Sequence, residues 1–75
     1  MKVIVFGIIA ERIQTNELVL ENIQDTDSLW RYLVEKYPLL KDIKISIAVN
    51  KHIINHNTLL NAETEVALLP PFSGG

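Results

Sequence analysis

The side chains that most often do chemistry are few and scattered in this chain. His52 and His56 are four residues apart, but they fall in a predicted strand and the loop after it, where that spacing does not place them on one face. No carboxylate accompanies them at metal-ligand spacing, so we expect no metal site. Ser28 and Ser73 have no histidine nearby in the sequence that would activate them as nucleophiles.

The remaining polar groups do not form a catalytic set either. The nine carboxylates are spread along the chain, and a core of this size offers little shelter in which two pKa values could be moved apart. There is no cysteine to act as a nucleophile or as a thiolate ligand, and no glycine-rich phosphate loop. We therefore expect no bound cofactor and no unaided activation of ATP.

The unusual chemical group is a C-terminal carboxylate carried by two glycines. Gly74 and Gly75 lack Cβ atoms, so this end can pass a narrow channel and adopt backbone angles closed to other residues. The Gly75 carboxylate is ionised at neutral pH and can attack the α-phosphate of ATP, which gives an acyl-adenylate open to a sulfur or nitrogen nucleophile. Gly75 is therefore the predicted reactive residue.

The residues before the glycines suit the presentation of that carboxylate. Pro70 and Pro71 cannot donate backbone hydrogen bonds, so they end sheet pairing and stiffen the exit from the fold. Phe72 and Ser73 then lead to the glycines. We expect a flexible reactive tail over residues 72–75, which Pro70 and Pro71 direct away from the domain.

Length and composition favour one small soluble domain. The chain has 75 residues, of which 48% are hydrophobic and 21% charged, with a net charge of −2. These values argue against disorder, and the absence of a basic stripe argues against nucleic acid as a partner. No apolar stretch is long enough for a membrane span, and neither an export signal nor a cysteine is found, so we expect a cytoplasmic protein.

The hydrophobic pattern predicts a hairpin, one crossover helix and further strands. The helix should begin near Asp25 with Thr26 as its N-cap, carry an apolar face that includes Leu29 and Leu33, and end at Pro38. Val34 and Tyr37 extend that face, and Trp30 stands at its margin. The other expected elements are strands over 3–9, 17–23, 44–50, 52–54 and 65–69, a turn over 10–16 and a loop over 55–63.

These elements describe an α+β roll over residues 1–71, with a mixed sheet of four to five strands and one main crossover helix. The first and last strands are strongly apolar, so we expect them to lie side by side at the centre of the sheet. One helix covers only one face of a sheet. Unless loops cover the other face, we expect an exposed apolar patch there for a protein partner, formed from among Ile4, Phe6, Leu69 and Phe72.

Residues 65–75 read EVALLPPFSGG, and Ala48-Val49-Asn50 lies in the third predicted strand. In these segments the chain resembles the small subunit of molybdopterin synthase, and residues 65–75 are the specific part. The N-terminal VIVFG segment with Glu11 after it, and residues 26–33, are similar too. Two turns depart from the family pattern: Glu63-Thr64 replaces the usual glycine-aspartate, and the short first loop lacks a glycine often found there.

The resemblance implies the ubiquitin-like β-grasp fold and the role of a sulfur carrier. Gly75 would be adenylated by an E1-like activating enzyme that uses ATP, and then converted to a thiocarboxylate. The tail would enter the active site of the large synthase subunit, in a heterotetramer of two small and two large subunits. There two carriers in turn would give sulfur to cyclic pyranopterin monophosphate and form the dithiolene, while the catalytic side chains belong to the large subunit.

Three other functions stay open from the sequence. A sulfur carrier for thiazole synthesis in the thiamine pathway shares the fold and the Gly-Gly end, although the Pro-Pro-Phe-Ser spacer and the Ala-Val-Asn segment argue against it. A ubiquitin-like modifier would be joined through Gly75 to lysines of other proteins. A pure interaction module would not need its terminal glycines at all.

Overall fold

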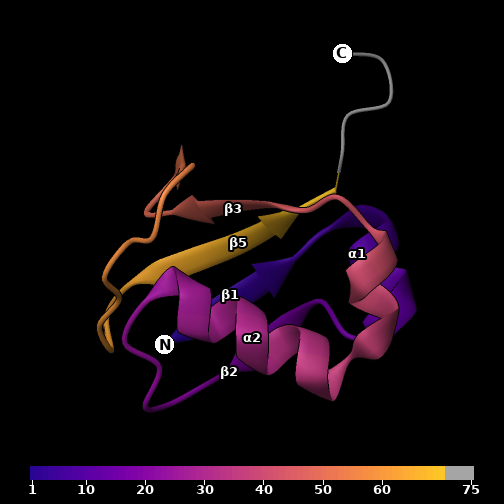
Figure 1. Ribbon diagram of the computed structural model, residues 1–75, viewed down its shortest axis with the longest axis horizontal. Helices are drawn as coiled ribbons and strands as arrows, with labels where there is room; N and C mark the ends of the chain where they lie inside the picture. Colours follow the sequence, from indigo (N-terminus) through magenta and orange to yellow (C-terminus); the bar gives the residue numbers. More distant parts are fainter. Residues whose placement is uncertain (71–75) are drawn as a thin grey trace.

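A five-stranded mixed sheet with helices on one face makes up the computed structural model, which describes residues 1–70 (Figure 1). The main helix α2 (Thr26–Lys36) crosses from the second strand to the third and is followed by a 3₁₀ helix, η1 (Pro38–Asp42). The predicted α+β architecture is confirmed. The strands are β1 (Lys2–Val5), β2 (Glu17–Val19), β3 (Ser46–Val49), β4 (His52–Ile53) and β5 (Glu65–Leu69), in the order β2-β1-β5-β3-β4.

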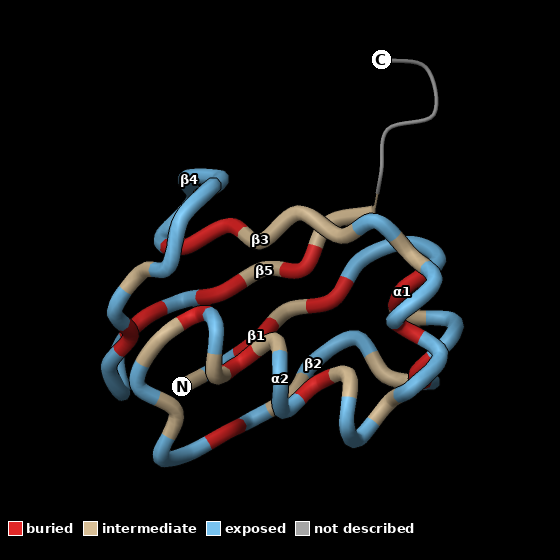
Figure 2. The backbone as a smooth tube through the Cα atoms, in the orientation of Figure 1, coloured by how far each residue is buried: buried red, intermediate tan, exposed pale blue. Residues whose placement is uncertain are grey.

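The first and last strands lie side by side, as predicted. β1 and β5 are parallel, with Val3 opposite Val66 and Val5 opposite Leu68. All four side chains are buried, and burial alternates along both strands because successive residues of a strand point to opposite faces (Figure 2). Leu29 and Leu33 of α2 complete the core on this face of the sheet.

The strand predicted over 3–9 and the turn predicted over 10–16 are wrong. The strand ends at Val5, and a short helix, α1 (Gly7–Ile13), fills the connection to β2. Gly7 has a φ of +57°, which turns the chain out of the sheet. Ile9 and Ile13 are four residues apart and therefore share the buried face of α1. One apolar run thus spans two elements with different periods.

The N-cap of α2 is Asp25 and not the predicted Thr26. An Asp25 carboxylate oxygen accepts from the Ser28 N–H at 2.9 Å. Thr26 is the first helical residue and is buried, where its hydroxyl accepts from the Thr58 N–H at 3.0 Å and donates to Asn57 at 3.3 Å. Contacts with a distant loop therefore decide between two good capping residues.

The rest of α2 follows the prediction closely. Leu29 and Leu33 are buried, whereas the other members of the apolar face are half-buried. The helix gives way at Tyr37, before Pro38, as expected for the residue that precedes a proline. The 3₁₀ helix η1 follows and was not predicted, and its Leu40 joins the core. No helix within residues 1–70 is long and apolar enough to cross a membrane.

Two turns shape the second half of the chain. Asn50 and Lys51 both have positive φ, which confirms the tight hairpin predicted between β3 and β4. Before β5, the Asn61 N–H donates to the Thr64 hydroxyl oxygen at 2.9 Å, and the Glu63 N–H donates to the Asn61 side chain at 2.8 Å. This side-chain bonding forms a turn without the glycine-aspartate pair that is usual in the resembled family.

Candidate functional site

The tail leaves the domain from the centre of the sheet. β5 runs between β1 and β3 and ends at Leu69, and Pro70 is the last described residue (Figure 1). A strand held on both sides cannot shift without breaking two sets of hydrogen bonds, so the exit point is fixed. The predicted reactive residue Gly75 and its neighbours Pro71, Phe72, Ser73 and Gly74 lie outside the described residues.

Gly7 packs directly against the tail exit. A Cβ atom at this position would lie 2.9 Å from Cγ of Pro70, which is closer than real Cβ contacts. Its φ of +57° also disfavours any residue with a side chain. Gly7 therefore holds the turn into α1 and leaves room for the Pro70 ring, a role that sequence reasoning missed. The available signal was a lone glycine inside an apolar run.

Two of the residues predicted for partner binding flank this exit. Phe6 is 46% exposed, and its N–H donates to the Leu68 carbonyl oxygen at 3.2 Å, which holds it beside the end of β5. Leu69 is half-buried and pairs with Ser46 of β3. The third predicted residue, Phe72, lies outside the described residues.

The sheet face turned away from α2, called the outer face below, carries an apolar area next to the exit. Strand register places Ile4 beside Ala67, and Ala67 beside Ala48. Ile53 lies opposite Ala48 and is 62% exposed. Ile4, Ala67 and Ala48 alternate with core residues along their strands, and Ile53 lies directly opposite Ala48, so all four share the outer face. This apolar area continues through Leu69 to the exit.

Charged side chains border the apolar area at the start of β1 and β5 and along β2. Lys2 and Glu17 form an ion pair at 3.1 Å, and Glu65 pairs with Lys2 in the β1–β5 register. Lys2 and Glu65 stand at the starts of β1 and β5, whereas the tail leaves from the end of β5. Glu17 lies on the edge strand β2, opposite Ile4. A partner that covers the apolar part of the face would therefore lie next to the exit, with charged groups at one margin.

The side chains considered first as catalytic or metal-binding take other roles. His52 and His56 are exposed, and their Nδ1 atoms lie within hydrogen-bond distance of Asn50 O and Asn55 Oδ1. Ser28 lies in the first turn of α2, where its N–H bonds to the cap. Residues 1–70 contain no group of three His, Cys, Asp or Glu side chains that could hold a metal ion.

The fold defines a class of protein. A mixed sheet in the order β2-β1-β5-β3-β4, crossed by one main helix, is the ubiquitin-like β-grasp arrangement. The structure of small archaeal modifier protein 1 (SAMP1) from Methanosarcina acetivorans matches with a TM-score of 0.80 and 30% identity, over 99% of this chain and 94% of that one. SAMP1 from Haloferax volcanii shares the fold with a TM-score of 0.81 at 23% identity, over 100% and 98% of the two chains.

The chain belongs to the ThiS family, which matches residues 3–75. It is 35% identical to a Caenorhabditis briggsae protein named molybdopterin synthase sulfur carrier subunit, over 100% of this chain and 96% of that one. A Mycobacterium tuberculosis protein of the same name is 32% identical, over the same shares of the two chains. These matches confirm the family resemblance inferred from the tail and the third strand.

Proposed function

We propose that this chain is the sulfur carrier subunit of a molybdopterin synthase. The observation that carries the proposal is the full-length similarity to two relatives of that name, which includes the terminal glycines. The arrangement of the domain supports it, because a fixed strand end and an adjacent apolar face suit a protein that presents its own terminus to a partner.

The reacting group in this proposal is the carboxylate of Gly75. One carboxylate oxygen attacks the α-phosphorus of ATP on an activating enzyme, pyrophosphate leaves, and an acyl-adenylate forms. Hydrosulfide then attacks the carbonyl carbon, AMP leaves, and loss of the proton on sulfur yields a thiocarboxylate. This carrier needs no bound cofactor of its own, because ATP is consumed on the activating enzyme and the sulfur is held on its own carbonyl carbon.

The proposed partners meet the chain at the exit and at the apolar part of the outer face. Phe6 and Leu69 flank the point where the tail leaves, so a large subunit that binds them is placed to receive the tail. The activating enzyme must hold the same tail, so the two partners are expected to compete for this surface. In the large subunit, the thiocarboxylate would give its sulfur to cyclic pyranopterin monophosphate.

A second candidate is a ubiquitin-like protein modifier. The observation in its favour is the 30% identity and full coverage shared with a protein named small archaeal modifier protein 1. The same adenylate would serve both functions, because an amine that attacks the carbonyl carbon gives an amide and a sulfur nucleophile gives a thiocarboxylate. The sulfur-carrier proposal is preferred because two relatives at 32–35% identity bear that name.

Deletion of Gly75 tests the proposal. The shortened chain should fold like the full chain, since it lacks only a terminal residue, but it should not support conversion of precursor by a large subunit with an activating enzyme, ATP and a sulfur source. A matched control is Leu59→Ala, which truncates a side chain that is 82% exposed at the other end of the domain and should leave conversion unchanged. Full conversion by the shortened chain would contradict the proposal.

A further experiment separates the two candidates. The full chain is incubated with host extract and ATP, and its products are resolved by mass. A carrier remains a single small species whose mass rises by the difference between sulfur and oxygen. A modifier appears in covalent conjugates of higher mass, joined through Gly75.

A further inference from the structure

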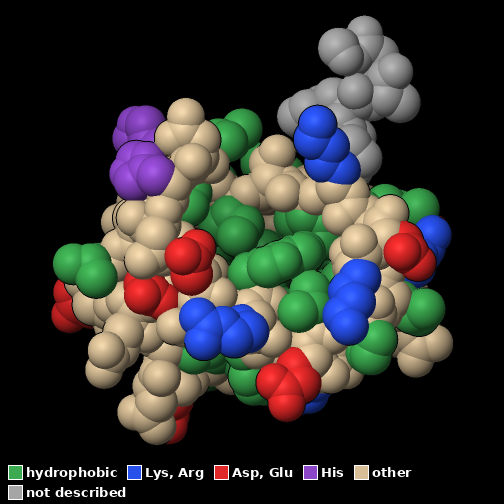
Figure 3. All heavy atoms as spheres, viewed as in Figure 1, with side chains coloured by type: hydrophobic (Ala, Val, Ile, Leu, Met, Phe, Trp, Pro, Cys, Tyr) green, Lys and Arg blue, Asp and Glu red, His purple; other side chains and the backbone are tan. Residues whose placement is uncertain are grey.

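A hollow lies between α2 and β3, on the face of the sheet opposite the outer face. Its volume is about 370 Å³, at the lower end of the range for ligand pockets. Seen from the side of α2, hydrophobic side chains gather in the middle of this face, between α2 and β3 (Figure 3). The apolar side chains that line it are Trp30, Ile45, Ile47 and Ile54, all half-buried.

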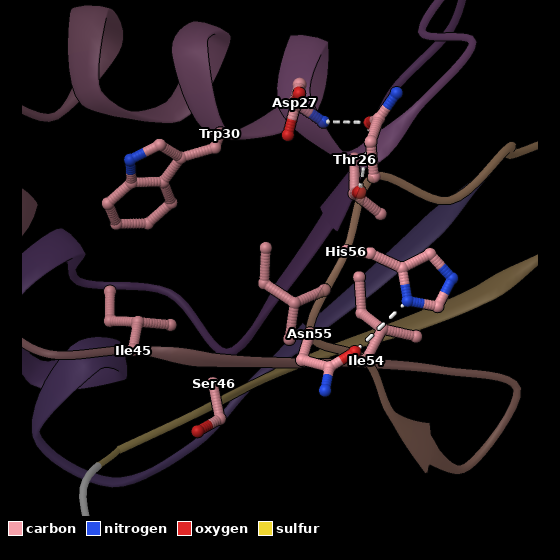
Figure 4. Close-up of a pocket in the computed structure, with 10 residues that line it drawn as sticks. Thr26, Asp27, Trp30, Ile45, Ser46, Ile54, Asn55 and His56 are labelled. Atoms are coloured by element: carbon pink, nitrogen blue, oxygen red, sulfur yellow. Dashed lines mark hydrogen bonds between the residues drawn. The ribbon is translucent and has the colours of Figure 1, made fainter.

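Three segments enclose the hollow. Trp30 comes from α2, Ile45 from the segment that leads into β3, and Ile54 from the chain after β4 (Figure 4). The Ile54 N–H donates to the Ile47 carbonyl oxygen at 2.9 Å, after which the chain leaves the sheet. Asn57 then ties this chain to the start of α2, where its side-chain oxygen accepts from the Asp27 N–H at 2.9 Å. The wall at residues 54–57 is therefore held in place.

The edge of β3 that borders the hollow has unpaired backbone groups. The Ile47 carbonyl oxygen accepts from Ile54 on the β4 side of β3, so the backbone groups of Ile47 and, two residues earlier, of Ile45 point to that side. Among the described residues, neither the N–H nor the C=O of Ile45 has a hydrogen-bond partner, and the Ile47 N–H has none. Such an edge is a template on which an extended segment can add as a further strand.

One charge borders the hollow. Asp27 is the only charged residue among those that line it, and its side chain is exposed. Within residues 1–70 the one ion pair is Lys2–Glu17, so the Asp27 carboxylate has no cationic partner there. A ligand that fits this hollow should combine an apolar side chain with a positive charge.

We propose that the hollow binds a short extended peptide segment of another protein. The segment adds as a strand to β3 at Ile45, places an apolar side chain against Trp30, and sets a basic residue near Asp27. The tail of a second copy of this chain fits less well, because residues 70–75 contain no basic residue and end in a carboxylate. This binding does not depend on the chemistry of Gly75.

The sequence offers a direct reporter, since Trp30 is the only tryptophan. Two synthetic peptides, acetyl-RVIVG-amide and acetyl-GVIVR-amide, place arginine at either end of an apolar strand. Titration of one of them into the full chain should shift Trp30 fluorescence to shorter wavelength with saturation. Amide hydrogen exchange should slow at Ile45 and Ile47. The same peptide with glutamine for arginine should bind about two- to fivefold more weakly, as expected for one exposed ion pair.

Variants locate the binding. Asp27→Asn should reduce binding of the arginine peptide to the level of the glutamine peptide. Trp30→Ala, measured by calorimetry, should weaken binding at least about tenfold, as for an aromatic residue at the centre of an interface. Tyr32→Ala is the matched control, because Tyr32 lies on α2 beside a different hollow, next to β2. It should bind like the unaltered chain, as should the chain without Gly75.

Several results would overturn the proposal. One is the absence of saturable binding by either peptide to the folded chain. Another is a retained preference for arginine in Asp27→Asn. Slowed exchange confined to β2 or to the outer face would place the peptide elsewhere. A Trp30 shift that follows protein concentration without peptide would assign the hollow to a second copy of the chain.

Discussion

Gly7 and Pro70 are in contact, so the turn that starts α1 and the exit of the tail constrain each other. A Cβ atom on Gly7 would approach Cγ of Pro70 to 2.9 Å, and the φ of Gly7 is +57°. The first and last strands are already joined in parallel up to Val5 and Leu68. Beyond this pairing, the Pro70 ring packs against the backbone of Gly7, where a side chain would leave it no room.

Replacement of Gly7 by alanine should destabilise the domain. We expect a loss of about 1–3 kcal/mol in the free energy of unfolding, since a non-glycine residue is held at positive φ and its Cβ atom meets a proline ring. Urea denaturation of the full chain and of Gly7→Ala measures the difference.

A double-mutant cycle separates the two causes of that loss. Pro70→Ala removes the Cγ atom that the new Cβ would meet, so Gly7→Ala should cost less in that background. The destabilisation by Gly7→Ala that persists in the Pro70→Ala background measures the strain of a positive φ at a residue with a Cβ atom. An equal loss of unfolding free energy in both backgrounds would show that the clash with Pro70 does not contribute to the destabilisation by Gly7→Ala.

The sequence alone predicts the parts of this fold that local patterns determine. Strongly apolar runs identify β1 and β5 as central strands, and positions 50 and 51 suit the tight turn that they form. The tail motif is a property of the sequence itself, and the family match includes it. Each of these inferences needs only neighbouring residues, which explains why each could be made.

The features that were missed depend on contacts between distant residues. The helix α1 was not predicted because residues 3–9 are apolar throughout and resemble one continuous strand. The turn at Gly7 that ends the strand lies against Pro70, which is near the other end of the sequence. The N-cap falls at Asp25 because residues 57 and 58 bond to Thr26. The hollow beside Trp30 is lined by residues from three segments that are separate in the sequence, so no local sequence pattern predicts it.

Phe6→Asp should weaken binding of the large subunit at least about tenfold, because it places a charge in the apolar area next to the tail exit. The fold should survive, since Phe6 is the N-cap of α1 and aspartate is a good capping residue. Leu59→Asp is the control, because Leu59 is more exposed and lies beside the start of α2. Calorimetry with the large subunit would contradict the proposed surface if both variants bound equally well.

Thr64→Val should destabilise the domain by about 1 kcal/mol, because the part-buried Asn61 N–H loses its acceptor. Thr64 is 6% exposed, and its hydroxyl oxygen accepts from the Asn61 N–H in the turn before β5. Thr15→Val removes a hydroxyl whose bond to Glu17 is exposed and should cost much less. Similar unfolding midpoints for the two variants would rule out a structural role for the turn hydroxyl.

Asp25 should make the stability of the domain depend on pH. The Ser28 hydroxyl and N–H, together with the Asn57 amide, lower the pKa of Asp25 below its ordinary value of 3.8. A carboxylate with a lowered pKa stabilises the folded state above its unfolded pKa, and this contribution is lost as the pH falls through the folded pKa. Asp25→Asn keeps a capping oxygen but does not titrate.

Thermal unfolding of both chains across acidic pH tests this assignment. The unaltered chain should be the more stable one at neutral pH, and the difference should shrink toward zero as the pH drops below the ordinary value of 3.8. A difference that stays constant, or that grows on acidification, would show that the charge of Asp25 does not stabilise the start of α2.

The central claim is that Gly75 carries sulfur, and the intact mass of the chain tests it most directly. The full chain is isolated from its native host under conditions that preserve thioesters and thiocarboxylates, and its mass is compared with that of the chain without Gly75. The account predicts a species heavier by the difference between sulfur and oxygen, found only when Gly75 is present and lost on hydrolysis. Only the unmodified mass, or the same mass increase in the chain without Gly75, would contradict it.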